Sequence, residues 1–227
     1  MANDIAVSVK GLKKSFKNVS VLNGVEFDVQ KGSIFALLGA NGSGKTSLLR
    51  CILGQYPHSG TVTWQGREIQ PGQRLVYPVF DDCPFYLNGS GALNLRLLGF
   101  RNTIASTSYL DAGTLRRPVR VYSLGQRKAL ALTAALGSGA ELLLLDEPTT
   151  GLDRDGMNRL KRDLRAVAAQ CAILATGHHL EFYDDVSERV LVLKEGLLTT
   201  VEREDWAERG GAGLVELYER RCASVQD

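Results

Sequence analysis

A glycine-rich segment between two apolar runs places the tightest constraint on the fold of this chain. The segment is GANGSGKT (39–46), and it follows SIFALLG (33–39), a continuous apolar run typical of a strand buried on both faces. The run KTSLLRCIL (45–53) has a helical pattern and stops at Gly54. A buried strand, a glycine loop and a helix in this order indicate an α/β domain with a parallel sheet.

Further apolar runs continue the alternation of strands and helices. Three are continuous and predict buried strands: ELLLLDE (141–147), AILAT (172–176) and RVLVL (189–193). Two others, IAVSV (5–9) and VEFDV (25–29), alternate apolar with polar residues, as strands exposed on one face do. Helical patterns lie between them, SLGQRKALALTAAL (123–136), with Ser123 as its N-cap, and MNRLKRDLRAVAAQ (157–170). The alternation predicts a doubly wound α/β core.

Residues 83–122 interrupt this alternation. GSGALNLRLLGF (89–100) predicts a short helix, and the stretch after it is poorly patterned. We therefore expect a single domain with a core from residues 1–82 and 123–205 and a small helical insertion at 83–122. Residues 206–227 form a tail with a short helix around LVELYERR.

Composition limits the class of protein. Hydrophobic residues make up 44% of the 227 residues and the net charge is +2, which gives no support for a protein that coats nucleic acid. The four cysteines are far apart with no CxxC pair, which favours free thiols in a reducing compartment. No secretory signal and no apolar run near the ~20 residues of a membrane span are evident. We expect a cytoplasmic location, or attachment to a membrane through a partner.

The glycine loop fits the pattern G-x-x-x-x-G-K-[ST], which binds phosphate. Gly39, Gly42 and Gly44 let backbone N–H groups curl around phosphate oxygens without Cβ clashes. Lys45 supplies a charge for the β- and γ-phosphates, and the Thr46 hydroxyl is a ligand for Mg²⁺. The alternative is a glycine turn that precedes Lys-Thr by coincidence. The other loop positions that we expect to hold the nucleotide are Asn41, Ser43 and Ser47.

Two carboxylates follow the most apolar strand. Four consecutive leucines deliver Asp146 and Glu147 to the carboxyl end of that strand, where ligands of such sheets bind. Asp146 is placed to hold Mg²⁺, directly or through water, and Glu147 to polarise an attacking water. The alternative is a strand that simply ends in exposed acids.

Three more stretches follow in order: YSLGQRKALAL (122–132), TTGLD (149–153) and ATGHHLE (175–181). Together with the two motifs above, they resemble the ATP-binding cassette (ABC) ATPases, from about residue 5 to about residue 200. The resemblance implies a P-loop NTPase core, an antiparallel β subdomain and a small helical subdomain. It also implies ATP and Mg²⁺ as cofactors, and two subunits that close head to tail around two ATP molecules.

The resemblance also implies roles for single residues. Ser123, Gly125 and Gln126 match the family signature, which contacts the γ-phosphate bound by the other subunit. Tyr122 and Leu124 depart from that signature, because Leu and Gly are commonest at these positions. The bulkier loop is expected to slow docking of the two subunits.

Three further roles follow from the same resemblance. Asp153 ends the loop that passes between the two active sites, and His178 matches the switch histidine that touches the γ-phosphate, with His179 as a surface residue. Phe16 lies 29 positions before Lys45, where the family places a ring that stacks on adenine. The alternative for Phe16 is a core position.

An acidic pair, Asp81 and Asp82, follows the apolar run before residue 81. In the family a glutamine that reaches Mg²⁺ and the attacking water lies here, and Asp81 matches its position. We therefore expect Asp81 to be a metal ligand and hydrolysis to depend unusually on Mg²⁺. The alternative is a solvated acidic turn.

Three functions remain open. The first is the ATP-hydrolysing subunit of a membrane transporter, peripheral on the inner face of the cell membrane. It would form a homodimer or heterodimer and drive a separate permease that docks on residues 83–122. The second is an ABC ATPase that acts on nucleic acid or ribosomes, and the third is a binding module with feeble hydrolysis. No nucleic-acid partner is expected, because a solvated face is the simpler explanation of the basic group Arg116, Arg117, Arg120, Arg127 and Lys128.

Overall fold

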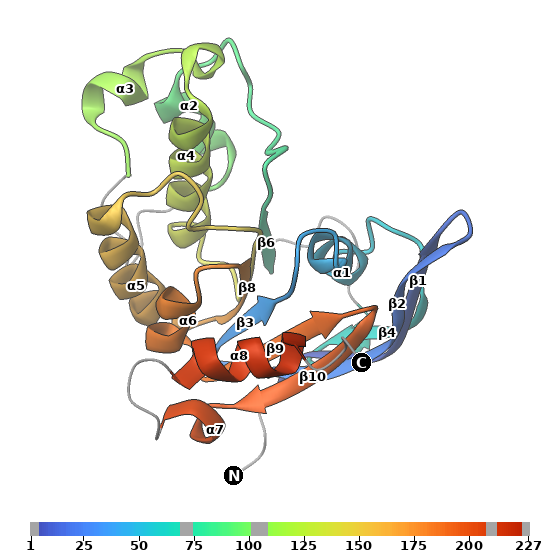
Figure 1. Cartoon of the computed structure of the whole chain (residues 1–227). Helices are drawn as coiled ribbons and strands as arrows, with labels where there is room; N and C mark the ends of the chain where they lie inside the picture. Colours follow the sequence, from blue (N-terminus) through green and yellow to red (C-terminus); the bar gives the residue numbers. More distant parts are fainter. Residues whose placement is uncertain (1–4, 69–74, 101–108, 208–212, 224–227) are drawn as a thin grey trace.

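The computed structural model describes residues 5–68, 75–100, 109–207 and 213–223 of the chain, and its elements form two sheets with helices around them (Figure 1). The larger sheet has six strands in the order β10-β9-β3-β8-β7-β6. All neighbours in it are parallel except β10, which pairs antiparallel with β9. The strands are β3 (Ile34–Leu38), β6 (Val76–Val79), β7 (Leu142–Leu145), β8 (Ala172–Gly177), β9 (Arg189–Lys194) and β10 (Leu197–Glu202).

The predicted buried strands are confirmed. Every residue of β3, β7 and β8 is buried. Alternate residues of these strands face two separate clusters: Leu143 and Leu145 pack in one, and Leu142 and Leu144 in the other. Continuous apolar runs therefore arise because both faces of the sheet are covered.

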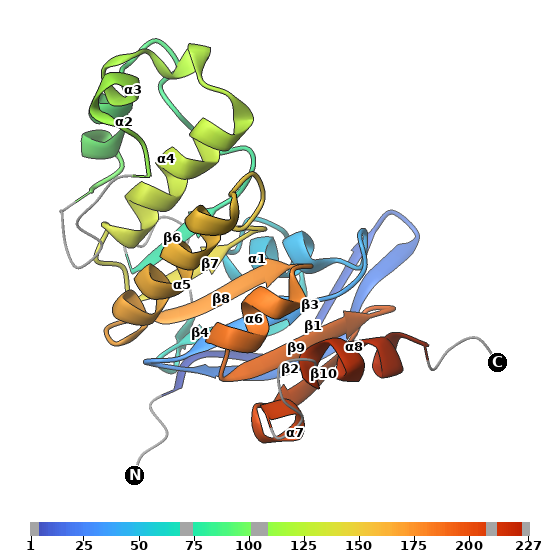
Figure 2. The same ribbon diagram turned by 60° about the vertical axis from the view of Figure 1, so that its left-hand side comes forward.

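Helices cover one face of the large sheet. They are α4 (Leu124–Leu136), α5 (Arg154–Ala168) and α6 (Leu180–Val186). Figure 2 shows them on the side of the sheet opposite to the second sheet. The predicted cap at Ser123 is confirmed: its side chain accepts from the Gln126 N–H, and Gly137 ends the helix. The helix α5 begins three residues earlier than Met157, because the Asp153 side chain caps it.

The other face of the large sheet packs against α1 (Lys45–Ile52) and the second sheet. This sheet is antiparallel, in the order β2-β1-β4-β5, which confirms the antiparallel subdomain. Its strands are β1 (Ile5–Phe16), β2 (Val19–Gln30), β4 (Ser59–Trp64) and β5 (Arg67–Glu68). The first two strands are longer than the alternating runs that predicted them, and irregular register between them accommodates the extra residues.

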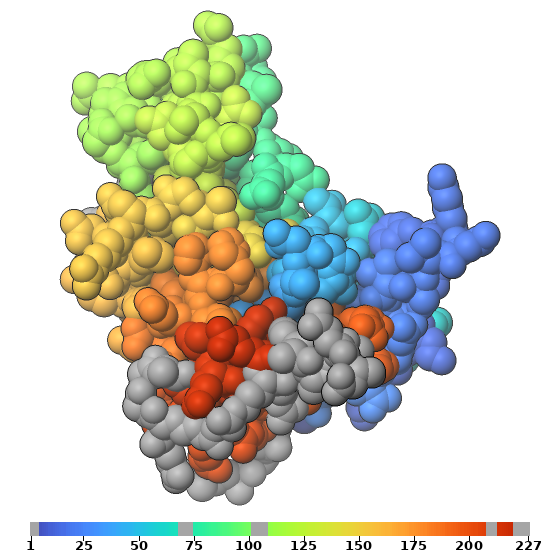
Figure 3. Space-filling model, viewed as in Figure 1, coloured from blue at the N-terminus to red at the C-terminus, as the bar shows by residue number. Residues whose placement is uncertain are grey.

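The helical part forms a lobe beyond the core (Figure 3). It contains α2 (Gly91–Leu97), α3 (Ala112–Arg116) and a 3₁₀ turn, η1 (Val119–Val121). A separate apolar cluster joins Leu95 and Val119 to Leu130 and Ala134 of α4. One face of α4 therefore packs with this lobe, whereas Ala131 and Ala135 on another face pack in the main core. Residues 101–108 of the expected insertion lie outside the described residues.

The tail carries two helices, α7 (Glu204–Ala207) and α8 (Gly213–Ala223), so the predicted helix near LVELYERR is confirmed. Trp206 and Leu214 are buried in the main core, which holds both helices against the large sheet. Across the described ranges, no helix combines the length and the apolar character needed to cross a bilayer.

Candidate nucleotide-binding site

The glycine loop connects β3 to α1, and close packing requires glycine at two of its positions. A Cβ on Gly39 would lie 2.5 Å from the Leu193 carbonyl oxygen, and one on Gly44 would lie 2.7 Å from a Val21 methyl group. Gly44 also has a φ of 105°, which is strained for other residues. Gly44 is the N-cap of α1 and provides no side-chain cap, so the first N–H groups of the helix are available to an anion.

Lys45 is buried, with 8% of its surface exposed. Its Nζ donates to the carbonyl oxygens of Gly39 at 2.8 Å and Ala40 at 3.1 Å. The ammonium group is therefore held over the loop and satisfied by main-chain oxygens that a phosphate could replace.

Asp146 brings the loop and the large sheet together. One carboxylate oxygen, Oδ2, accepts from the Thr46 hydroxyl at 2.8 Å, and the other, Oδ1, accepts from the Thr176 hydroxyl at 2.7 Å. Thr46 and Asp146 thus present adjacent hard oxygen donors, which suit Mg²⁺. Among the described residues no group of three or more His, Cys, Asp or Glu side chains could hold a metal ion.

Glu147 has a strained backbone, and both its N–H group and its carboxylate have hydrogen-bond partners. Its φ is 50°, and its backbone N–H donates to the Thr176 hydroxyl at 2.9 Å. Its Oε2 lies 2.8 Å from Nδ1 of His178. A non-glycine residue in the left-handed region at a sheet edge is typical of a functional position.

Thr176 was not identified from the sequence. It lies in β8, has no exposed surface and contacts both carboxylate residues. The Tyr183 hydroxyl donates to its carbonyl oxygen at 2.6 Å, and burial raises the pKa of that tyrosine well above its usual value. The signal in the sequence was a hydroxyl residue at the carboxyl end of an apolar strand, next to a strand that ends in acids.

The two adjacent histidines differ in their contacts. Both are exposed, but His178 meets Glu147, whereas His179 stacks beside His178 with ring centroids 4.3 Å apart and precedes α6. The geometry brings His178 to the carboxylate and leaves His179 outside that contact.

Phe16 ends β1 and is 40% exposed, which is at odds with a core position. Its ring packs edge to face with Tyr56, with centroids 5.4 Å apart, and the Lys14 ammonium lies 4.5 Å from the ring centroid. A partly exposed, laterally supported ring is suited to stacking on a flat heterocycle.

The residues around Ser123 form a second region. Ser123 and Gln126 cap α4 reciprocally, Asp153 caps α5, and Gly125 lies against Gly151. They line a cavity of about 610 Å³ to which no residue of the Lys45 loop contributes. A single chain therefore keeps its signature residues and its glycine loop in different sites.

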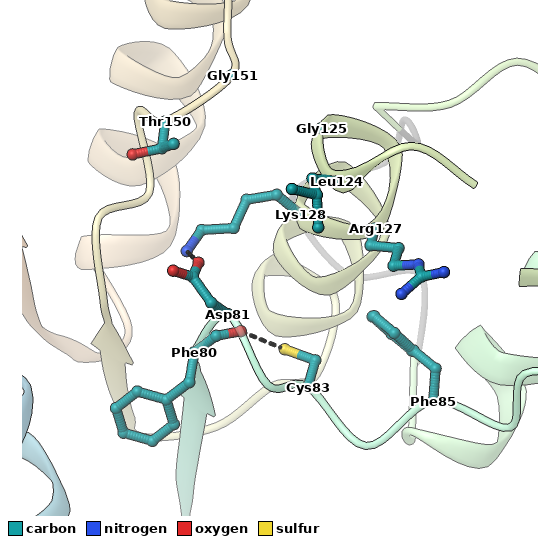
Figure 4. Close-up of a pocket in the computed structure, with 10 residues that line it drawn as sticks. All are labelled: Phe80, Asp81, Cys83, Phe85, Leu124, Gly125, Arg127, Lys128, Thr150 and Gly151. Atoms are coloured by element: carbon teal, nitrogen blue, oxygen red, sulfur yellow. Dashed lines mark hydrogen bonds and ion pairs between the residues drawn. The ribbon is translucent and has the colours of Figure 1, made fainter. Parts of the chain in front are cut away.

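Asp81 pairs with a lysine. Its Oδ1 accepts from Lys128 Nζ at 2.9 Å (Figure 4). The same ammonium donates to the Asp146 carbonyl oxygen at 2.5 Å. Lys128 is only 6% exposed, so the expectation that it belongs to a solvated basic face is wrong. The adjacent Asp82 pairs instead with Arg50 at 2.7 Å, and that hydrogen bond lowers the pKa of the carboxyl. The assignment of Asp81 as a metal ligand stays a prediction.

Comparisons with known proteins agree with this geometry. A family model described as ABC transporter matches residues 22–87. The lantibiotic transport ATP-binding protein SrtF of Streptococcus pyogenes is 27% identical over 222 residues, which cover 93% of this chain and 95% of that protein. A putative ABC transporter ATP-binding protein of Streptomyces coelicolor is 34% identical over 224 residues, covering 86% and 78% of the two chains.

A solved structure described as the ATP-binding subunit of an ABC transporter has the same fold. Its TM-score is 0.84 at 22% identity, with 95% of this chain and 98% of that chain covered. The chain belongs to the ABC transporter family, among its ATP-binding subunits. It is an ATPase whose hydrolysis is coupled to transport, and action on nucleic acid or ribosomes is not favoured.

Proposed function

We propose that two copies of this chain, or one copy and a similar subunit, close around two ATP molecules and drive a separate membrane permease. The observation that carries the proposal is the contact between Glu147 and His178 at 2.8 Å, beside an Asp146 that is hydrogen-bonded to Thr46. A base and its partner lie next to a phosphate-binding loop and a potential ligand set, which is the arrangement that ATP hydrolysis needs.

In this proposal the residues divide the work between them. Glu147 accepts a proton from the attacking water while His178 holds the carboxylate and reaches toward the γ-phosphate. Lys45 exchanges its main-chain partners for phosphate oxygens. Thr46 and Asp146 would hold Mg²⁺, which supplies charge stabilisation at the transferred phosphoryl group when bound.

Dimer closure explains the second region. Ser123 caps a helix whose first turn is open to solvent, and Leu124 beside it is 82% exposed. Both suit contact with a partner copy, where the helix N-terminus meets the γ-phosphate held by the other Lys45. The large side chain at 124 would then press on the partner where most relatives in the family have no side chain.

The permease is proposed to dock on the helical lobe, at the cytoplasmic face of the membrane. Four large apolar side chains of the lobe are exposed: Tyr86 by 58%, Leu87 by 47%, Leu97 by 66% and Val121 by 44%. Exposed apolar side chains grouped on one subdomain favour a protein partner. Transport then depends on how ATP binding moves this lobe.

The direct test is Glu147→Gln. The amide cannot accept the proton, so kcat should fall by about 10²- to 10⁴-fold while ATP still binds. Gel filtration with ATP and Mg²⁺ should then give a stable dimer, and Glu141→Gln, which alters an acid at the other end of β7, should stay monomeric after turnover. Full activity in Glu147→Gln, or no dimer in any nucleotide state, would refute the proposal.

A further inference from the structure

Lys128 contacts two parts of the chain that the proposed function treats separately. Its ammonium donates to the Asp81 carboxylate at 2.9 Å and to the Asp146 carbonyl oxygen at 2.5 Å. Figure 4 shows the side chain reaching from α4 to Asp81 across the space beside Phe80. We infer that Lys128 is a positioning residue of the nucleotide site, which couples Asp81 and the signature helix to Asp146. This inference rests on the proposed function.

The burial of Lys128 is what makes the contact informative. A lysine that is only 6% exposed loses most of its hydration, which is costly unless its charge is paired and its protons are used. Asp81 supplies the charge and Asp146 supplies a second acceptor. The side chain is therefore held in one position, unlike the long cations of an exposed ion pair.

The contacts close a ring through the edge of the sheet. The Asp146 N–H donates to the Val79 carbonyl oxygen at 2.8 Å, and Asp81 follows two residues after Val79. Lys128 closes the ring, because its ammonium joins the Asp81 carboxylate to the Asp146 carbonyl oxygen. It also lies in α4, five positions after Ser123. A shift of α4 against the sheet must therefore stretch one of the two Lys128 contacts and disturb the residue that holds Thr46.

Lys128 balances the charge of Asp81. The Asp81 side chain is 86% exposed and borders a cavity of about 250 Å³, while its pairing with Lys128 leaves the two side chains neutral together. The site thus gains no net charge from Asp81. Removing either partner changes the local charge by one unit, and the sign depends on which partner is removed.

The opposite charge changes caused by removing Asp81 and by removing Lys128 provide the test. In Asp81→Ala the unpaired Lys128 ammonium repels Mg²⁺, so the Mg²⁺ concentration that half-saturates binding of a fluorescent ATP analogue should rise by about threefold. In Lys128→Met the unpaired Asp81 carboxylate attracts Mg²⁺, so the same midpoint should fall by about threefold. The double variant should return close to the wild-type midpoint, because neither charge remains.

Hydrolysis gives a second readout. Lys128→Met should lower kcat by about tenfold, since Asp146 loses its tie to α4. Asp81→Ala should lower kcat by less, because Lys128 loses only one of its two acceptors, and the double variant should lose no more than Lys128→Met. Asp82→Ala is the matched control: it breaks the neighbouring ion pair to Arg50, which includes neither Lys128 nor Asp146, and should leave the midpoint and kcat within about twofold. Melting temperatures without nucleotide check folding, and Lys128→Gln replaces Lys128→Met if the latter does not fold.

Each outcome decides the matter. The inference would be overturned if the Mg²⁺ midpoints of the two single variants shifted in the same direction, or if the midpoint of Asp81→Ala were unchanged. It would also be overturned if the kcat losses multiplied in the double variant. A wild-type chain without ATPase activity would instead count against the proposed function, so the two failures are distinguishable.

Discussion

Thr176 offers the sharpest test of how the site is built, because its one hydroxyl contacts both Asp146 and Glu147. Thr176→Val keeps the shape of the side chain and removes the hydroxyl. The variant loses the hydrogen bond to Asp146 Oδ1 at 2.7 Å and leaves the Glu147 N–H without its acceptor at 2.9 Å. Because Thr176 is wholly buried, water cannot replace either contact without rearrangement.

The cost can be worked from these contacts. A hydrogen bond to a charged group contributes about 1.5–3 kcal/mol, and a buried unsatisfied N–H costs about 1–3 kcal/mol. We therefore expect the free energy of unfolding to fall by about 3 kcal/mol, which lowers Tm by about 6–12 °C for a chain of this length. The Asp146 carboxylate keeps only Thr46 to fix it, so kcat should fall by about tenfold.

Thr133→Val is the matched control. Thr133 is also buried, donates to the Ala129 carbonyl oxygen at 2.8 Å and accepts from the Tyr109 N–H at 3.1 Å, but contacts no site residue. It loses a neutral hydrogen bond and leaves the Tyr109 N–H without its acceptor, so the cost should be about 2 kcal/mol and Tm should fall by about 4–8 °C, with kcat unchanged. Calorimetry and steady-state ATPase assays measure both. If Thr176→Val matches Thr133→Val in both quantities, Thr176 does not hold the carboxylates.

Three further outcomes are expected. The arginine of α1 lowers the pKa of Asp82 below its usual 3.8, so the pair stabilises the fold above that pH and the stabilisation is lost as pH falls through the lowered pKa. Asp82→Ala should therefore cost only about 0.5 kcal/mol in urea unfolding at pH 7, and nothing at strongly acid pH; a larger loss in acid would contradict this. Burial raises the pKa of Cys51 to about 11 and of Cys171 to about 12, so alkylation at pH about 8 should label both in urea and neither in the folded chain, as peptide mass spectrometry can check. Phe16→Ala should raise KM for ATP about fivefold with little change in kcat, whereas Val19→Ala, 66% exposed at the adjacent turn, should not; equal KM values would argue against stacking.

Local signals in the sequence predicted most of the fold. The leucines of β7 are buried on both faces, and a strand with that requirement has few alternatives. The cap of α4 could be predicted because Ser123 and Gln126 lie three residues apart and satisfy each other's backbone groups. The start of α5 was placed too late because the capping role of Asp153 was not recognised.

Contacts between distant segments could not be predicted in the same way. Thr176 meets Asp146 only because β7 and β8 pair in register, with Leu145 opposite Ala175. Lys128 and Asp81 are 47 positions apart, and nothing in the spacing of either residue indicates the other. A lysine that follows an arginine in a helix has the local pattern of a solvated face, and only packing of α4 against the sheet edge buries it.

The placement of α4 links these observations to function. One helix presents Ser123 at its exposed N-terminus, packs Leu130 and Ala134 against the helical lobe, and sends Lys128 into the edge of the large sheet. A permease that pushes the lobe would move the helix start relative to the core, and the Lys128 contacts would report that movement at Asp146. Transport and hydrolysis can be coupled through such a helix without contact between the permease and the nucleotide, because a rigid element with two alternative positions is sufficient.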